Sequence, residues 1–301
     1  MLDFRVNTFL CVCRTMNFTK AAAALHLTQP CVSQHIRCLE EYYGVKLFRY
    51  DNKTLRLTDA GRKVYNGILA FRHDEIHLKH VVQSAGRSVR RLRLGATLSV
   101  GEYFLPERLA RFLRHSAPVQ VDFVVSDTQD LLARLDGGTI DMAMVEGFFS
   151  KESYDHILIK KEELLPVCGR EYPVGKIRSL SDVFAHPLIV REVGSGTREV
   201  LERYLTENGY SIDRFPCVST INSPAVILRF LEENLGISFL YRSVVTESIR
   251  QGRLATFAIP DYRVVHEFNC IWRKGSIFAD TYRTLFKEIM AGGAAKTPAS
   301  V

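Results

Sequence analysis

Residues 18–61 constrain the fold of this chain more than any other stretch, because they combine an alanine-rich segment, a sharp turn and a basic hairpin. Positions 21–24 are all alanine, which leaves so little side-chain bulk that a second helix can approach closely. We predict a first helix over 20–25, with Thr19 as its N-cap and a break at His26. This order of elements predicts a winged helix-turn-helix.

A second helix is predicted after Thr28, which can cap it, with Pro30 at its second position. Proline is tolerated there because its missing N–H would have no intrahelical partner. Val32, Ile36 and Leu39 then recur at spacings of four and three. That periodicity places the three apolar side chains on one buried face.

The opposite face of the second helix carries polar side chains suited to the major groove of DNA. Glutamine pairs well with adenine, arginine pairs with guanine, and serine serves a base or a phosphate. The alternative is a solvated polar face on an ordinary helical domain. We interpret the face as a DNA-reading surface made of Gln29, Ser33, Gln34 and Arg37.

A tyrosine–glycine pair at 43–44 ends this helix, and residues 46–57 then alternate basic and apolar side chains around Asp51 and Asn52. This alternation predicts the two-stranded wing of the motif. Lys53 and Arg56 are predicted to hold the DNA backbone.

Several motifs follow one another in order along this stretch. They are N-F-T at 17–19, the alanine-rich helix, QPxVSxxIxxLE at 29–40, GxxLF at 44–48 and LTxAG at 57–61. With them the stretch resembles the DNA-binding domain of LysR-type transcriptional regulators, whose pattern begins with serine or asparagine followed by phenylalanine and threonine. Tyr50 departs from the family pattern, which usually has arginine there, and Arg49 lies one residue early. The residues expected to contact double-stranded operator DNA are Thr19, Gln29, Pro30, Ser33, Gln34, Arg37, Arg49, Lys53 and Arg56.

Charge divides the chain into two modules. Residues 1–93 hold 16 Lys and Arg against 7 Asp and Glu, whereas residues 94–301 hold 24 against 26. The basic character belongs to the front third, which predicts a nucleic-acid-binding module joined to a globular domain with a different partner. With 47% hydrophobic residues, 301 residues can bury more than one core.

Residues 58–87 read as one long helix between the modules, with Thr58 as its cap. We predict a DNA-binding domain over 1–58, a linker helix over 59–89 and an effector-binding domain over 90–301. The linker is expected to pair with its copy in a homodimer or homotetramer, the tetramer being usual in the family, and so to space two recognition helices. Its apolar seam consists of Ala60, Val64, Ile68, Phe71, Leu78 and Val82.

Three histidines on this helix, His73, His77 and His80, lie at i, i+4 and i+7, a spacing that could hold a metal ion. Only Asp74 accompanies them closely, and its side chain is expected to point elsewhere. We therefore predict a solvated polar stripe, with no metal and no cofactor other than a small-molecule effector.

From residue 92 onward, strands alternate with helices, which predicts parallel sheets whose ligand site lies at the carboxyl ends of the strands. The first unit has strands predicted at 92–96, 119–125 and 141–145 and helices at 101–115 and 128–135. The second has strands at 164–168, 188–191, 217–221 and 237–240, helices at 197–208 and 223–233, a return strand at 268–272 and a closing helix at 279–290.

Two such lobes joined by crossing strands form a cleft. The arrangement resembles the periplasmic-binding-protein fold that the LysR family uses as its effector domain. Lobe I is predicted over 90–163 and 267–301, and lobe II over 164–266. The predicted fold is thus a winged helix-turn-helix, a long linker helix and a two-lobed α/β effector domain.

Loops that leave the strands supply the predicted contacts to a small, anionic metabolite. The run 194–197 precedes a helix, whose free N–H groups and dipole attract an anion. Ser195 and Thr197 could instead merely cap that helix. Similar runs in the family have proline at Val193 and a second hydroxyl at Leu98, so the identity of the effector stays open. The expected contacts are Thr97, Ser99, Thr128, Glu146, Gly194, Ser195, Gly196, Thr197 and Asn222.

Other functions fit the sequence less well. It lacks GxSxG, HExxH, Walker A and GxGxxG motifs, which argues against an enzyme. Seven scattered cysteines without a CxxC pair argue for a reducing cytoplasm, although a redox-sensing regulator of this fold stays an alternative, as does an effector-independent DNA-binding protein. No signal sequence or membrane span is predicted. We expect a cytoplasmic, ligand-responsive regulator that contacts RNA polymerase if it is an activator.

Overall fold

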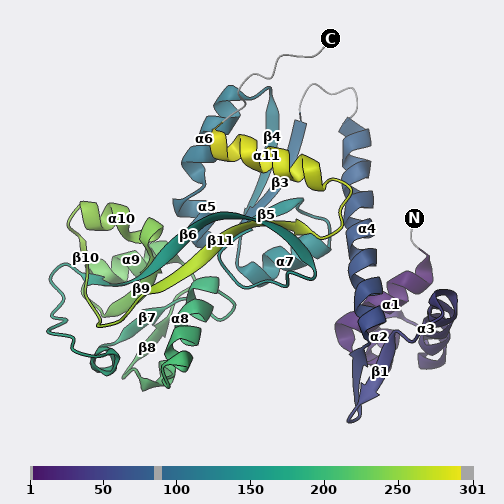
Figure 1. Ribbon diagram of the computed structural model, residues 1–301, viewed down its shortest axis with the longest axis horizontal. Coiled ribbons are helices and arrows are strands. Elements are labelled where there is room, and N and C mark those ends of the chain that lie inside the picture. Colours follow the sequence, from purple (N-terminus) through teal and green to yellow (C-terminus); the bar gives the residue numbers. More distant parts are fainter. Residues whose placement is uncertain (1–2, 85–89, 293–301) are drawn as a thin grey trace.

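The computed structural model describes residues 3–84 and 90–292, which form a small helical module, a long helix and a larger two-lobed domain (Figure 1). The small module contains α1 (Phe4–Thr15), α2 (Phe18–Leu25), α3 (Gln29–Tyr43), β1 (Phe48–Asp51) and β2 (Thr54–Leu57). The sequence motifs thus fold as the predicted winged helix-turn-helix.

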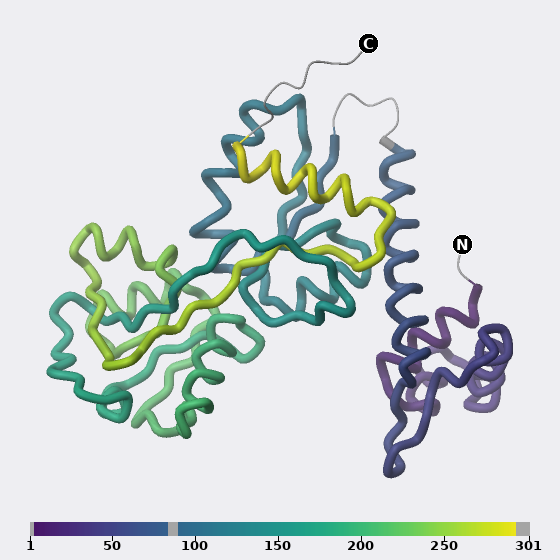
Figure 2. Tube along the Cα trace, in the orientation of Figure 1, coloured from purple at the N-terminus to yellow at the C-terminus, as the bar shows by residue number. Residues whose placement is uncertain are grey.

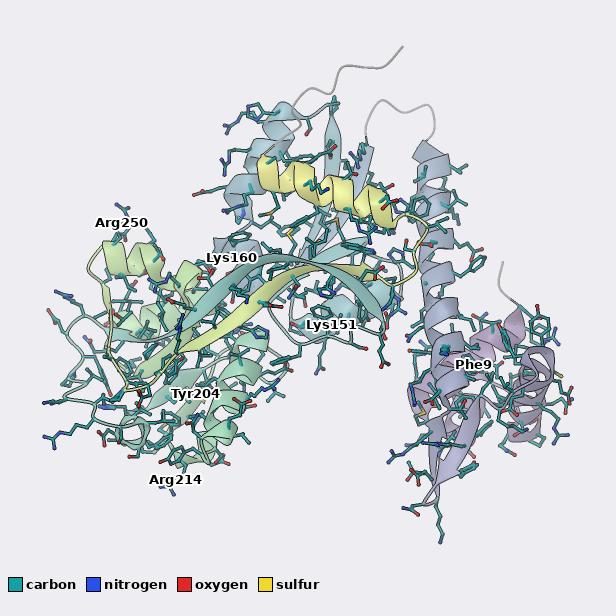
Figure 3. All side chains as sticks on the ribbon, viewed as in Figure 1. Phe9, Lys151, Lys160, Tyr204, Arg214 and Arg250 are labelled. Carbon is teal, nitrogen blue, oxygen red and sulfur yellow. The ribbon has the colours of Figure 1, made fainter. Side chains whose placement is uncertain are left out.

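Helix α1 was not predicted, yet it supplies the centre of this module. Phe9, labelled in Figure 3, and Val12 are fully buried, and the Phe9 ring lies 5.5 Å from that of Phe48 on the wing. Apolar residues cover α1 on several sides, so the sequence carries no clear amphipathic period to mark it.

The cap of α2 differs from the prediction. The Asn17 side chain accepts a hydrogen bond from the Lys20 backbone N–H at 2.9 Å, and the helix begins at Phe18. Thr19 lies inside the first turn, so its prediction as the N-cap is wrong: Asn17, two residues earlier, already satisfies the free Lys20 N–H. Thr28 caps α3 as predicted, by accepting from the Cys31 N–H at 3.4 Å.

Helix α4 (Asp59–Ser84) stands between the small module and the two-lobed domain (Figures 1 and 2). Thr58 caps it by accepting from the Gly61 N–H at 2.9 Å. The predicted extension to residue 87 lies outside the described residues. Ile68 packs into the core of the small module, whereas Phe71, Leu78 and Val82 are exposed.

The prediction of a solvated histidine stripe on α4 is wrong. His73 is fully buried, and its Nε2 lies 3.1 Å from the Ile140 carbonyl oxygen. His77 Nδ1 lies 2.7 Å from a carboxylate oxygen of Asp141. Asp74, which we expected to point away from the histidines, accepts a 2.9 Å hydrogen bond from the Ile277 N–H. These polar groups attach the linker helix to the larger domain, a contact that the helical period alone does not specify.

Lobe I is built on three parallel strands with helices on both faces. The split of the predicted 101–115 helix occurs at Pro106, which lacks an N–H and therefore begins a new helix. The strands are β3 (Arg90–Ala96), β4 (Val119–Val125) and β5 (Met142–Val145), and the helices are α5 (Leu98–Tyr103), α6 (Pro106–His115), α7 (Thr128–Asp136) and α11 (Ala279–Ala291).

Lobe II repeats the pattern with a second set of parallel strands. These are β7 (Leu188–Val190), β8 (Val218–Thr220) and β9 (Ile237–Tyr241), with helices α8 (Gly196–Glu207), α9 (Pro224–Glu232) and α10 (Arg242–Arg250), the short turns η1 (Leu180–Ala185) and η2 (Ile212–Arg214), and strand β10 (Leu254–Thr256). Neither α10 nor β10 was predicted.

Two long antiparallel strands, β6 (Tyr154–Gly169) and β11 (Val264–Arg273), cross between the lobes, and Lys160 marks β6 near the crossing in Figure 3. They pair with β5 on one side and β9 on the other, which joins both lobes into one sheet of order β4-β3-β5-β11-β6-β9-β7-β8, with β10 paired to β6. The predicted pair of α/β lobes joined by crossing strands is therefore confirmed, and β6 is much longer than the predicted 164–168.

Among the described residues, no helix has the length and apolar character needed to cross a membrane.

We expect Gly61→Ala to destabilise the chain by about 1–3 kcal/mol, because a Cβ at this buried glycine would collide with the Leu47 carbonyl oxygen. Gly67→Ala is the matched control on the same helix: nothing lies within 4 Å of its added methyl group, and alanine favours a helix. Denaturant unfolding should show opposite signs for the two variants. Equal effects would contradict the packing argument.

Candidate DNA-binding surface and interlobe site

Helix α3 presents its polar face to solvent. Gln29, Gln34 and Arg37 are exposed, and Ser33 is half-buried beneath Gln29, which donates to its hydroxyl at 2.9 Å. The opposite face, with Val32, Ile36 and Leu39, is buried in the small module. The exposed face can therefore enter a groove without disturbing the core.

The wing carries three exposed cations, Arg49, Lys53 and Arg56. Arg49 and Arg56 are cross-strand neighbours in the β1–β2 register. Asn52 and Lys53 form the turn with φ of 45° and 64°, the left-handed geometry of a tight hairpin. Arg56 Nε also lies 3.7 Å from Asp51 Oδ2. Thr19 and Pro30, the other predicted contacts, are exposed at the first turns of α2 and α3.

A groove of about 280 Å³ separates α3 from the wing. Ser33 and Arg37 line one side, and Lys46 and Tyr50 line the other. Tyr50 is 71% exposed, so an aromatic ring stands at the surface where the family usually has arginine. The groove brings part of the predicted reading face together with the wing.

Eight of the nine predicted effector contacts are buried, and several hydroxyl groups among them lack the partners that capping would give. Thr97 and Ser195 occupy the N-cap positions of α5 and α8 but make no side-chain capping bond. Thr128 follows Asp127, whose carboxylate caps α7 instead. The interpretation of Ser195 as a simple helix cap is therefore wrong.

The two lobes meet at these residues. Ser99 Oγ of lobe I and Thr197 Oγ1 of lobe II lie 3.5 Å apart. A Cβ at Gly196 would lie 2.5 Å from the Gly147 Cα, so only glycine permits this approach. Gly194 has φ of 92°, which turns the loop from β7 toward α8.

Arg191 adds a buried cation that is absent from the predicted contacts. It is 2% exposed, and its Nε and Nη2 donate to Glu192 at 2.8 and 2.7 Å. Its Nη1 has no partner among the described residues. The signal in the sequence is an arginine that directly follows the apolar strand β7 and precedes the glycine-serine loop.

Glu146 lies at the end of β5 and is 1% exposed. Burial raises the pKa of its carboxyl to about 7, although the nearby Arg191 guanidinium and Ser99 act in the opposite direction. The buried polar atoms of the interlobe residues that lack a hydrogen-bond partner within the described chain are Thr97 Oγ1, Thr128 Oγ1, Glu146 Oε2, Arg191 Nη1 and Ser195 Oγ.

Asn222 does not belong to this buried set. It is exposed in the turn between β8 and α9, next to Ser223, which caps α9 through the Val226 N–H at 3.4 Å. The structure thus separates Asn222 from the other eight predicted residues.

Among the described residues, histidines, cysteines and acidic residues form no cluster of three or more that could hold a metal ion. Burial raises the pKa of the Cys168 and Cys270 thiols, which disfavours the reactive thiolate.

Known protein families match both parts of the chain. Residues 5–62 match the bacterial regulatory helix-turn-helix proteins of the lysR family, and residues 85–291 match the LysR substrate binding domain. The HTH-type transcriptional activator CmpR of Synechocystis is 30% identical over 283 residues, which cover 92% of this chain and 91% of that protein. The regulator CysL of Bacillus subtilis is 26% identical over 274 residues, 88% of this chain and 89% of that one.

Solved structures share the fold at lower identity. Full-length LysG of Corynebacterium glutamicum with bound effector Arg is 14% identical, with a TM-score of 0.59 over 98% of this chain and all of that one. The regulatory domain of Synechocystis CcmR in complex with 2-PG is 20% identical, with a TM-score of 0.59 over 69% of this chain and 99% of that one. The family models that match residues 5–62 and 85–291, together with the similarity to CmpR, place the chain in the LysR family of transcriptional regulators, which bind DNA, carry an effector-binding domain and are not enzymes.

Proposed function

We propose that a small anionic metabolite binds between the lobes and changes how a homo-oligomer contacts its operator. The observation that carries this proposal is a set of buried polar atoms, contributed by both lobes, that have no hydrogen-bond partner within the described chain. A bound ligand can supply the hydrogen bonds that these atoms do not make within the described chain, and each such bond contributes about 0.5–1.5 kcal/mol.

Hydrogen-bond donors dominate the interlobe residues, which favours an anion. The hydroxyls of Thr97, Thr128 and Ser195 and the Arg191 guanidinium can all donate. The N-terminus of α8 adds free backbone N–H groups and a favourable dipole. Glu146, with its raised pKa, supplies a further donor when protonated.

The contacts of α4 offer a route from this site to DNA. Asp141, which binds His77 of the linker helix, lies in lobe I directly before β5, and Glu146 follows the same strand. A ligand that shifts lobe closure would thereby shift the attachment of α4 and the recognition helix that it carries.

We further propose that α4 pairs with its copy in a homodimer or homotetramer. Phe71, Leu78 and Val82 are 59%, 48% and 63% exposed and lie at heptad-like spacings. Pairing there would bury these side chains and present two α3 helices to a palindromic operator. Contact with RNA polymerase belongs to the same proposal if the protein is an activator. We also propose that the chain divides into a DNA-binding domain over 1–58, a linker helix over 59–89 and an effector-binding domain over 90–301.

For DNA reading, we expect Arg37→Ala to lower affinity for an operator selected from random duplexes about 10–100-fold, while affinity for a scrambled duplex changes little. Arg56→Ala should weaken binding to both duplexes alike and reduce the salt slope by about one. Fluorescence anisotropy at several salt concentrations measures both effects. An equal loss on both duplexes for Arg37→Ala would contradict base reading by this residue.

For the effector, a thermal-shift screen of metabolite anions against the full chain should find one that raises Tm. Thr197→Val should abolish that shift, because the hydroxyl lies at the meeting point of the lobes. Thr206→Val is the matched control on the same helix α8, since Thr206 is exposed and bonds only its own helix at Glu202 O. An undiminished shift in Thr197→Val would sink the interlobe assignment.

The raised pKa of Glu146 makes stability depend on pH. The folded chain holds this proton from the usual value of 4.5 up to about 7, so the free energy of unfolding falls as pH rises through this window. A rise of the Glu146 pKa from 4.5 to about 7 corresponds to a change of ~3 kcal/mol in the free energy of unfolding across this window. Glu146→Gln should flatten the decline, measured by denaturant unfolding at pH 5 and 8. The exposed variant Glu107→Gln should keep the wild-type decline; an identical slope in both variants would count against a buried, protonated Glu146.

A further inference from the structure

A second cavity, of about 270 Å³, lies between the linker helix and lobe I. Helix α4 contributes His77, His80 and Val81, strand β3 contributes residues 90–94, and Tyr282 and Leu285 come from α11. Figure 1 shows these elements side by side near the carboxyl end of α4. Thr97 follows the other end of β3, so the cavity and the interlobe residues occupy opposite ends of one strand.

The lining of this cavity combines apolar walls with a distinct set of charged side chains. Leu92, Leu94 and Leu285 are buried and give an apolar lining. Asp141 is the acidic residue of the lining, but its carboxylate already binds Arg93 at 3.1 Å and His77 at 2.7 Å. The acidic charge is therefore balanced within the wall.

Cations at the cavity remain available to a ligand. Arg90 and Arg91 are both 46% exposed, and their pairs with Glu288 and Asp122 lie near the surface. Exposed ion pairs contribute little stability, so these guanidinium groups can turn to a new anion at small cost. The Tyr282 hydroxyl, buried and without a partner among the described residues, offers a neutral donor.

We propose that this cavity binds a small amphipathic monoanion, an apolar body with one carboxylate, against Leu285 and with its charge toward His80 and Arg91. Its volume suits a ligand smaller than most drug-sized molecules. Because the walls come from both α4 and lobe I, the ligand stabilises the attachment of the linker helix. This site is separate from the interlobe site, and the two ligands would not touch each other.

The lowered pKa of His80 supports a negative charge on the ligand. Burial, followed by the charges of Arg93 and Arg91, lowers the pKa of His80 below its ordinary value. A bound carboxylate opposes that repulsion and raises the pKa of His80, so affinity falls as pH rises through the raised value. The titratable and charged groups around it are His77, Arg90, Arg91, Arg93, Asp141 and Tyr282.

The test uses benzoate as the probe and benzamide as its uncharged counterpart, in calorimetric titrations of the full-length protein. We expect saturable benzoate binding, at least about tenfold weaker benzamide binding, and about tenfold weaker benzoate binding in His80→Gln. His80→Gln should also remove most of the pH dependence of affinity. Leu285→Trp should abolish binding by filling the cavity, with circular dichroism as the check on folding.

Thr197→Val separates this proposal from the interlobe one, since its benzoate affinity should equal that of the wild type. Loss of benzoate binding in Thr197→Val with retention in His80→Gln would overturn the second site and assign the anion to the interlobe cleft. Absence of benzoate binding to the wild type, or equal binding of benzamide, would also overturn it.

Discussion

The antiparallel pairing of β6 with β11 is the interaction on which the rest of the larger domain depends. It runs from the Val264–Leu164 pair to the Arg273–Tyr154 pair and shifts register between Phe268 and Asn269. Strands β5 and β9 attach to its two outer edges, so each lobe is hydrogen-bonded to the same two-stranded frame. Relative movement of the lobes must therefore come from twisting of this frame, since separate sliding would break its ladder.

The same frame also holds the linker helix. Arg273, at the end of β11, is 1% exposed; its Nη1 donates to Asp136 at 2.8 Å and its Nη2 to the Asn66 carbonyl oxygen of α4 at 3.3 Å. A buried guanidinium is costly to desolvate unless such bonds are made, so removing the Asp136 carboxylate would leave the charge of Arg273 uncompensated. The strand that joins the lobes thus also reaches α4, and lobe geometry and linker position share one set of contacts.

The sequence predicts those elements whose structure depends on neighbouring residues in the chain. The period of Val32, Ile36 and Leu39 and the Thr28 cap define α3, and alternating apolar runs define the lobes. Prediction from the sequence fails where distant contacts decide. The burial of His73 and the bond of His77 to Asp141 depend on residues 140 and 141, which lie far away in the sequence. Helix α1 is apolar on several sides, so its sequence has no amphipathic period to detect. The sequence likewise does not show whether Thr97, Thr128 and Ser195 cap their helices or lack a partner, because the answer depends on residues that approach them only in the folded chain.

Strand β3 connects the two ligand-binding regions that we propose, with Thr97 after its carboxyl end and the apolar cavity along its amino end. Neither ligand would touch the other, so any coupling must pass through the attachment of α4 to lobe I. If both ligands favour the same attachment, each strengthens the other's binding by the same factor, because linkage is reciprocal. If only the cavity ligand contacts α4 directly, the interlobe ligand acts through Asp141 and its bond to His77. The carboxylate of Asp141 is then the group at which the two influences meet, since it also neutralises Arg93 beside the cavity.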